Sequence, residues 1–219
     1  MPQIGEKAPE LAISEWVQGL PTTFADERDH VVLVEVFQVN CPGCFLYGIP
    51  EAINIYNQYA DDGIRVMGVA TAFEDYDKNT LENLHALAEH GTVIGETHRA
   101  LKQYGQLENG TLPYKIPFPL GMDELTRVNG QVSDDYIMAY IKAQLPDFDN
   151  ESLSRRQDII QRVRNYMSTK EYSAKTFEMY ALRGTPSTIL IDRRGILRDV
   201  AFGQTGTIES KVVKLLQED

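Results

Sequence analysis

The two cysteines of this 219-residue chain stand three residues apart, in the tetrapeptide Cys41-Pro42-Gly43-Cys44. Two thiols at that spacing can form a disulfide with each other or take part in binding a metal ion. A closed zinc site needs four ligands, and the sequence has no second cysteine pair to complete one. None of the four histidines has metal-ligand spacing relative to the cysteines. We therefore expect no metal, and we expect all thiol chemistry to take place in this tetrapeptide.

The position of Cys41 predicts a reactive thiol. It follows an apolar, β-branched segment and precedes a helical pattern, with Pro42 at the first helical position, where no N–H is needed. As the N-cap, its sulfur faces free backbone N–H groups and the positive end of the helix dipole. Both favour the thiolate, so the pKa of Cys41 should lie below the ~8.5 of a free cysteine. Cys44, one turn into the helix, is better shielded and suits the role of resolving thiol.

The hydrophobic pattern around the tetrapeptide predicts an α/β fold. Residues 30–37 and 64–70 are typical of buried strands in a parallel sheet, and the helix at 42–60 joins them in a right-handed crossover. One side of this helix is apolar, with Phe45, Leu46, Ile49, Ile53, Tyr56 and Ala60. Further helices are expected at 79–90, 97–104, 133–145, 151–172 and 208–216, and strands at 188–192 and 197–202.

Two further segments are predicted at the margins of the sheet. Residues 11–13 and 21–24, on either side of Gly19, indicate an N-terminal β-hairpin. Residues 118–122 form a short extended segment crowded by prolines. Because proline cannot donate to a strand ladder, we expect this strand to lie at an edge or to make few hydrogen bonds.

The order of these elements predicts a single domain over residues 1–219, with a mostly helical insertion at about 124–175. Its two helices each have an apolar stripe: Tyr136, Ile137, Tyr140 and Ile141 on the first, and Ile159, Ile160, Val163 and Met167 on the second. The short turn between them, at 146–150, favours an antiparallel pair. Since the chain leaves the insertion just before residues 184–187, we expect the insertion to determine partner choice, with a passive cap over the sheet as the alternative.

Composition excludes several function classes. Apolar residues make up 42% of the chain and charged residues 24%, as in ordinary globular proteins. The net charge of −11 argues against nucleic acid or anionic lipid as the main partner. The longest apolar stretch is too short for a membrane span, and the N-terminus lacks a secretory signal. We therefore expect a cytoplasmic protein, with a leader already removed as the alternative.

Other motifs accompany the cysteine pair. They are Gly184-Thr185-Pro186-Ser187, followed by a strand at 188–192 and Arg193-Arg194-Gly195; the N-terminal segments 5–9 and 15–19; and the segment 118–123. Together these make the chain resemble the thioredoxin superfamily, in its redoxin branch of TlpA-like and alkyl hydroperoxide reductase–thiol-specific antioxidant proteins. The resemblance covers residues 4–123 and 177–218 and leaves the insertion unmatched. It implies a thioredoxin-like α/β fold, a central mixed sheet flanked by helices.

The resemblance also implies roles for single residues. The proline that matches Pro186 is cis in that family and faces the cysteine pair across the substrate groove, so Thr185, Pro186 and Asn40 are expected to bind substrate. Glu35 falls where thioredoxins carry a buried carboxylate that shuttles protons. Burial beside a thiol is where shifted pKa values gather, which favours this role over a structural carboxylate paired with lysine.

The chain also departs from the family pattern. Asn40 stands where a tryptophan usually precedes the first cysteine, which removes an apolar lid from the groove. Pro50 lies six residues after Cys44, instead of the usual five. With Gly48 nearby, this spacing predicts a kink or a π-bulge in the helix.

We therefore predict a thiol–disulfide oxidoreductase without organic cofactor. Cys41 attacks and forms a mixed disulfide with a protein partner; Cys44 resolves it, leaving the redox-active disulfide Cys41–Cys44. Its partners would be protein disulfides or dithiols and an upstream reductase or oxidant.

Two alternatives remain. A peroxiredoxin-like thiol peroxidase would carry Thr or Ser three residues before the reactive cysteine, where this chain has Gln38. A non-enzymatic, redox-sensing module would use the insertion to bind a partner according to the state of the disulfide.

Overall fold

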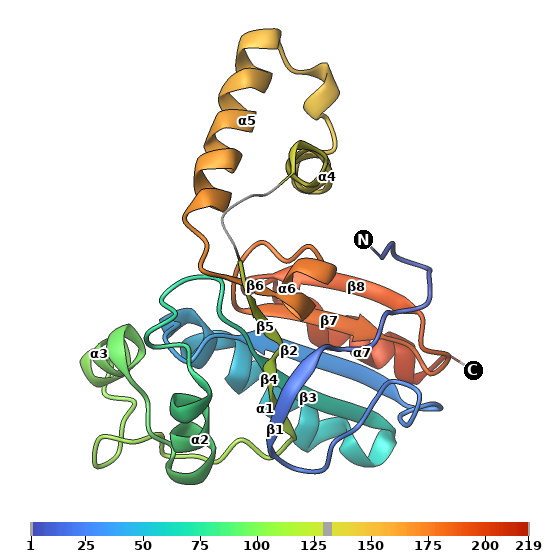
Figure 1. Ribbon diagram of the computed structural model, residues 1–219. Helices are drawn as coiled ribbons and strands as arrows, with labels where there is room; N and C mark the ends of the chain where they lie inside the picture. Colours follow the sequence, from blue (N-terminus) through green and yellow to red (C-terminus); the bar gives the residue numbers. More distant parts are fainter. Residues whose placement is uncertain (1, 129–132, 219) are drawn as a thin grey trace.

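A computed structural model describes residues 2–128 and 133–218 and contains a six-stranded mixed sheet (Figure 1). The strands lie in the order β1-β4-β3-β2-β7-β8, with β2 parallel to β3 and antiparallel to β7. Their bounds are β1 Ile13–Gln18, β2 Val31–Phe37, β3 Ile64–Ala70, β4 Leu120–Asp123, β7 Ser187–Ile191 and β8 Leu197–Phe202. This is the predicted α/β architecture, and the β2–helix–β3 unit is confirmed at its core.

Helices cover the sheet, and the sheet separates two apolar cores. They are η1 Cys44–Gly48, α1 Ile49–Tyr59, η2 Ala60–Asp62, α2 Leu81–His90, α3 Gly95–Gln103, α6 Lys175–Met179 and α7 Ile208–Leu216. Every residue of β2 is buried, because its side chains alternate between the two faces. Leu33 and Phe37 pack with α1 and α7 on one face, while Val34 and Val36 pack with Phe177 of α6 on the other.

The helix that follows the cysteine pair contains the predicted π-bulge. After a helical start at residues 42–43, the segment Cys44–Gly48 forms a π-turn, and the N–H of Ile49 bonds to the carbonyl of Cys44, five residues back. The wider turn changes which residues of α1 face the core. Ala52 and Ile55 are buried, whereas Ile53 and Tyr56 of the predicted apolar side are half-buried.

The predicted N-terminal hairpin is wrong. Residues 13–18 form β1, but residues 21–24 form no strand, and β1 pairs with β4 in antiparallel fashion. The strand partner therefore comes from about a hundred residues further along the chain. A local turn at Gly19 does exist, with a φ of 77°. It directs the chain away from β1 instead of back along it.

The expected edge position of the proline-crowded strand is also wrong. β4 lies between β1 and β3, inside the sheet. β4 can lie inside the sheet because it begins at Leu120, directly after Pro119, the last proline of the cluster. No residue of the strand itself therefore lacks an N–H. The carbonyl of Pro119 still accepts a hydrogen bond from the N–H of Gly68 in β3.

The segment between β4 and α6 begins and ends in a small second sheet, in which β5 (Leu125–Arg127) pairs with β6 (Tyr172–Ala174). Between them, α4 (Asp134–Gln144), η3 (Phe148–Asn150) and α5 (Leu153–Ser168) form what we call the helical arm, residues 133–168. The arm projects from the main sheet and has its own apolar centre around Ile137, Ile141 and Phe148 (Figure 1). Figure 1 shows α4 end-on and α5 from the side, so the two helices cross and the expected antiparallel pairing is wrong.

Within the described residues, none of the helices has both the length and the apolar composition that crossing a bilayer requires.

Asp123 attaches α6 to the end of β4. Its carboxylate is fully buried and accepts hydrogen bonds from the backbone N–H groups of Thr176 (2.7 Å) and Phe177 (3.1 Å) and from the hydroxyl of Thr71 (2.8 Å). Burial raises the pKa of Asp123, and these donors oppose the rise. One side chain therefore holds β3, β4 and α6 together where the chain enters and leaves the helical arm.

We predict that Asp123→Ala lowers the free energy of unfolding by roughly 3 kcal/mol, because it leaves two buried N–H groups without an acceptor. Urea denaturation measures the change. Asp61→Ala, at an exposed position, serves as the control and should stay within about 0.5 kcal/mol of wild type. A loss below about 1 kcal/mol for Asp123→Ala would show that water or a rearranged side chain replaces the carboxylate.

Candidate functional site

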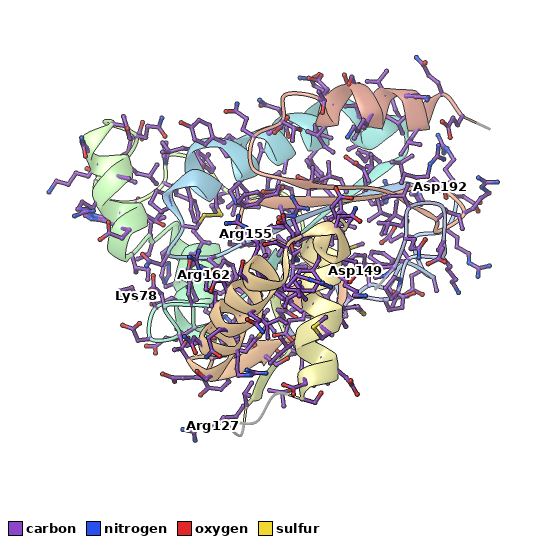
Figure 2. The ribbon with its side chains drawn as sticks, turned by 90° about the horizontal axis from the view of Figure 1, so that it is seen from above. Lys78, Arg127, Asp149, Arg155, Arg162 and Asp192 are labelled. Carbon is purple, nitrogen blue, oxygen red and sulfur yellow. A yellow bond between two sulfur atoms is a disulfide. The ribbon has the colours of Figure 1, made fainter. Side chains whose placement is uncertain are left out.

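Cys41 and Cys44 form a disulfide at the start of the helix after β2, with their Cα atoms 5.4 Å apart. From above, the yellow disulfide bond lies beside α3 and to one side of the helical arm (Figure 2). Cys41 is 9% exposed and Cys44 is completely buried. Cys41 is therefore the half of the disulfide that keeps some access to solvent, and its role as the attacking thiol stays a prediction.

The surroundings of the Cys41 sulfur favour a negative charge. Its Sγ accepts a hydrogen bond from the backbone N–H of Cys44 at 3.2 Å, one of the two donors that the N-cap argument named. The same atom lies 3.6 Å from the carbonyl oxygen of Thr185. In the reduced state, the thiol can donate to this carbonyl, while the thiolate keeps the N–H of Cys44. A hydrogen-bond donor and a helix N-terminus both stabilise a thiolate relative to a thiol.

Pro186 lies against the helix that carries the cysteines. The Thr185–Pro186 peptide bond is cis. The ring of Pro186 packs beside Gly43 and Gly48. A Cβ added to Gly43 would lie 3.6 Å from Cδ of Pro186, and a Cβ added to Gly48 would lie only 2.7 Å from Cβ of Pro186. The structure thus brings Thr185 and Pro186 to the cysteine pair, as the resemblance implied.

Glu35 is buried on β2 with one carboxylate oxygen unpaired. Its Oε2 accepts a hydrogen bond from the hydroxyl of Thr188 at 3.1 Å, whereas Oε1 has no hydrogen-bond partner. Burial raises the pKa of Glu35 to about 8; the Thr188 hydroxyl opposes this and the charge of Glu51 adds to it. No lysine or arginine among the described residues pairs with this carboxylate, so the lysine-paired structural alternative is wrong.

The π-turn brings a backbone without a side chain directly over Glu35. A Cβ added to Gly48 would lie 2.1 Å from Oε1 of Glu35, so any larger residue would displace the carboxyl group. Gly48, at the end of the turn that Cys44 begins, therefore lies directly against the buried acid.

Asn40 lies next to Cys41, but its side-chain amide is buried and already engaged. Nδ2 donates to the carboxylate of Asp75 at 2.7 Å, and Oδ1 accepts from the backbone N–H of Glu96 at 2.7 Å. The expected direct contact with substrate therefore gains no support from the position of this amide.

Sequence reasoning did not single out Thr188 or assign a contact to Gly48. The register of β2 against β7 places Thr188 opposite Glu35, a pairing that no local pattern reveals. The sequence predicts a distorted helix near Gly48, but the contact of Gly48 with Glu35 follows only from the fold. Among the described residues, no three His, Cys, Asp or Glu side chains gather in a way that could hold a metal ion.

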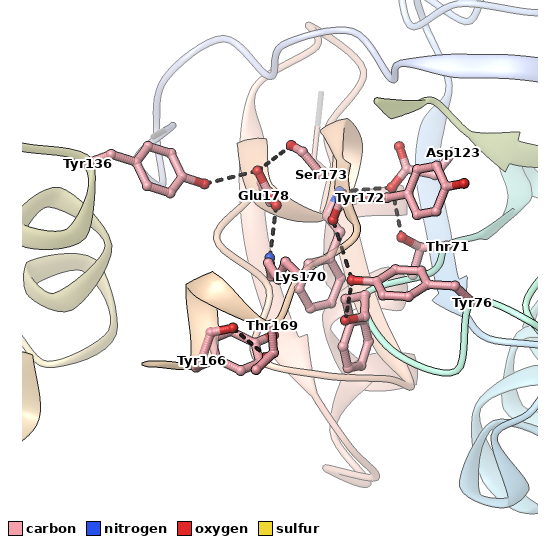
Figure 3. A network of polar contacts seen from close by, with 12 residues as sticks. Thr71, Tyr76, Asp123, Tyr136, Tyr166, Thr169, Lys170, Tyr172, Ser173 and Glu178 are labelled. Atoms are coloured by element: carbon pink, nitrogen blue, oxygen red, sulfur yellow. Dashed lines mark hydrogen bonds and ion pairs between the residues drawn. The ribbon is translucent and has the colours of Figure 1, made fainter. Parts of the chain in front are cut away.

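A polar network connects the helical arm with the main sheet (Figure 3). Glu178 of α6 accepts hydrogen bonds from Lys170 (2.9 Å), Ser173 (2.6 Å) and Tyr136 of α4 (2.9 Å). Burial alone would raise the pKa of Glu178, but the hydrogen bonds from Ser173 and Lys170 outweigh it and lower the pKa. The carboxylate thus remains charged and contacts both α4 and the segment that follows α5.

The loop after β3 connects this network to the cysteines. The hydroxyl of Tyr76 donates to the carbonyls of Phe73 (3.0 Å) and Tyr172 of β6 (3.4 Å). In the same loop, the N–H of Phe73 donates to the side chain of Gln38 at 3.2 Å. Residues 71–79 therefore contact both the segment before Cys41 and the base of the helical arm.

The sequence matches no protein-family model and no curated protein. Solved structures do match. A thioredoxin-like superfamily protein is 27% identical, with 98% of each chain covered and a TM-score of 0.59. A thiol-disulfide isomerase from Corynebacterium glutamicum gives the same identity, coverage and TM-score.

The fold and the cysteine pair are therefore those of the thioredoxin-like superfamily. Within that superfamily, the chain has the features of a thioredoxin-like thiol–disulfide oxidoreductase.

We predict that Cys41 is the thiol with the lower pKa in the reduced protein. Iodoacetamide labelling at pH 6, mapped by mass spectrometry, should modify Cys41 at least about tenfold faster than Cys44, because Cys41 keeps some exposure where Cys44 has none, and because it has the N-terminal N–H donor. Labelling of the unfolded protein provides the control, since both thiols then react alike. Faster labelling of Cys44 in the folded protein would reverse the assigned roles.

We also predict that Glu35 makes stability depend on pH. Since the pKa of Glu35 is about 8 in the folded protein and the ordinary pKa of a glutamate is 4.5, the folded state binds more protons between these values. The free energy of unfolding should therefore fall as pH rises from about 4.5 to about 8 and change no further above. Glu35→Gln removes this slope. Between about pH 4.5 and about pH 8, the free energy of unfolding of the oxidised wild type should therefore fall by several kcal/mol more than that of the oxidised variant. Denaturation curves of the wild type with the same midpoint and slope at pH 5 and pH 8 would contradict the raised pKa.

Proposed function

We propose that this protein exchanges disulfides with protein partners through Cys41 and Cys44. The observation that carries the proposal is a disulfide beside Pro186 whose two cysteines are unequally buried: Cys41 keeps 9% exposure, while Cys44 is completely buried. We include Thr185 in the substrate site, because its carbonyl lies beside the reactive sulfur and its neighbour Pro186 borders it.

The exchange runs in two balanced steps. In the reducing direction, the Cys41 thiolate attacks a partner disulfide; a mixed disulfide forms and one partner sulfur leaves as a thiolate. Cys44, deprotonated, then attacks Sγ of Cys41, and the second partner sulfur leaves. Two electrons pass to the partner, and the Cys41–Cys44 disulfide is formed. The oxidising direction is the reverse, with Cys44 as the leaving thiolate.

Glu35 serves the buried cysteine in this scheme. Because its pKa is about 8, a substantial part of the carboxyl is in each protonation state near neutral pH. The ionised form can accept the proton of Cys44 when that thiol must attack. The protonated form can return a proton when Cys44 leaves. Thr188 holds one oxygen of the carboxyl, which leaves the unpaired Oε1 for the transfer.

The thiol peroxidase alternative receives no support from the position three residues before Cys41. Gln38 is buried there, and its Oε1 accepts the N–H of Phe73 at 3.2 Å, so no hydroxyl is available for a peroxide. A redox-sensing module would hold its partner in a stable complex, whereas an enzyme releases the partner and turns over repeatedly. The trapping experiment below distinguishes the two.

Cys44→Ser provides the test of the proposed exchange. We expect this variant to accumulate mixed disulfides between Cys41 and protein partners, because the resolving thiol is absent. The wild-type protein should release the same partners and turn over repeatedly with dithiothreitol as reductant. Cys41→Ser is the matched control and should trap far less. A stable, stoichiometric complex with wild type and no turnover would favour the redox-sensing module instead.

We further propose that the chain is one thioredoxin-like domain whose helical arm, within the insertion at about 124–175, selects partners. The contacts through Tyr76 and Glu178 support this proposal, since they fix the base of the arm beside the loop that borders the cysteines. The alternative remains a passive extension.

Replacing residues 129–170 by an Asn-Gly turn tests the arm while keeping the β5–β6 ladder. We expect the reduction of a small disulfide to survive, and capture of partners by the Cys44→Ser trap to fall at least about tenfold, on the scale of a few lost interface anchors. Circular dichroism and a cooperative melting curve check that the shortened chain folds. If it folds and traps the same partners equally well, the arm has no part in recognition.

A further inference from the structure

Asn40, the residue before Cys41, connects three separate segments of the chain. Its backbone N–H donates to Oδ1 of Asn79 at 2.9 Å, Nδ2 donates to Oδ2 of Asp75 at 2.7 Å, and Oδ1 accepts the N–H of Glu96 at 2.7 Å. The residue is only 6% exposed. A buried amide with partners on both its donor and its acceptor side is held in one orientation.

The contact with Glu96 caps α3 from outside the helix. Residue Ile94 stands at the N-cap of α3 and has no side chain that can accept a hydrogen bond. The first turn of a helix has free N–H groups, and Asn is among the best acceptors for them. Asn40 provides that acceptor from a distant part of the sequence. The hydroxyl of Thr97 adds a second link, donating to the carbonyl of Val39 at 2.8 Å.

Gly95 makes this close approach possible. Its φ is +53°, and an added Cβ would lie 2.3 Å from Oδ1 of Asn40. A side chain at this position would therefore be strained by the backbone conformation and would also push the cap away. Both features point to the same arrangement, in which the first turn of α3 rests directly on Asn40.

The contact with Asp75 fixes the loop at 74–79. Its turn is closed by hydrogen bonds from the N–H groups of Lys78 (2.8 Å) and Asn79 (2.9 Å) to the carbonyl of Asp75. Asn79 also donates through Nδ2 to the carbonyl of Glu74 at 2.9 Å. Asn40 holds this closed turn at two points, through its backbone N–H and its Nδ2.

We propose that Asn40 is a positioning residue that holds α3 and the loop at 74–79 as one fixed wall beside Cys41, and that protein disulfides are selected by their fit against this wall. The inference rests on the proposed exchange function. It gives position 40 a role in substrate choice that acts through its neighbours. A small disulfide needs little of this wall, whereas a folded or peptide substrate must pack against it.

The first experiment compares substrates in three variants. Asn40→Ala removes the amide, and Gly95→Ala disturbs the same contact from the other side. Gly91→Ala is the matched control, because it has a similar positive φ of +65° but no neighbour closer than 3.4 Å to an added Cβ. The kcat/KM is measured for insulin, as a protein disulfide, and for oxidised dithiothreitol or dithionitrobenzoate, as small disulfides.

We expect the ratio of the protein to the small-disulfide kcat/KM to fall about fivefold or more in Asn40→Ala and Gly95→Ala, on the scale of a lost helix cap, and to stay within about twofold of wild type in Gly91→Ala. A role in stability alone would lower both rates in parallel. A constant ratio in a protein that turns over both substrates would overturn this inference. Absence of turnover by wild type with every substrate would instead refute the proposed exchange function.

Amide hydrogen exchange tests the contacts themselves. Asn40→Ala should speed exchange at Glu96 by between about 2-fold and 30-fold, the range expected for a helix cap. Asn40→Asp keeps an acceptor for Glu96 but places a carboxylate against Asp75, so it should preserve protection at Glu96 and lose protection at Asn79. Unchanged exchange at Glu96 in Asn40→Ala would show that Asn40 does not hold α3 and would overturn the proposal independently of any assay of activity.

Discussion

The burial of one carboxyl group, that of Glu35, is the constraint on which the site depends. This acid occupies the central strand of the sheet, where every other side chain of β2 is apolar, and it has a single hydrogen bond, from Thr188. An acid in that position resists ionisation, because the charged form would be almost unsolvated. The turn above it must then leave room for the carboxyl, which Gly48 and the π-turn provide.

Much of this arrangement could be predicted from the sequence where the determining pattern is local. The apolar runs on either side of the cysteines define the β2–α1–β3 unit, and Pro50 with Gly48 indicates the distorted helix. The pairing of β1 with β4 could not be predicted, because it joins segments about a hundred residues apart. Asn40 illustrates the same limit for the site. Its contact with substrate was expected because it precedes Cys41 in the sequence, while its actual partners come from the distant loop at 74–79 and from the first turn of α3.

The loop after β3 also provides a connection through which the helical arm can influence the cysteines. The loop after β3 contacts Gln38 and Asn40 on one side and Tyr172 at the base of the arm on the other. Such contacts couple two parts of a protein only if each has alternative arrangements, and a rigid connection would merely fix the geometry. In the proposed scheme, Cys41, Cys44 and Glu35 perform the chemistry, while the surrounding loops and the helical arm select the partner.

The proposed transfer of the Cys44 proton to Glu35 can be tested through the rate at which Cys44 resolves a mixed disulfide. A mixed disulfide formed on Cys41 with a chromogenic thiol can be followed as Cys44 expels that thiol, across pH 6–9, in wild type and in Glu35→Gln. If Glu35 accepts this proton, Glu35→Gln should resolve the mixed disulfide at least about tenfold more slowly near pH 7, within the usual range for a lost acid–base group. The difference should narrow as hydroxide takes over at high pH. Equal rates across the whole pH range would contradict the proposed transfer and leave Glu35 as a structural residue.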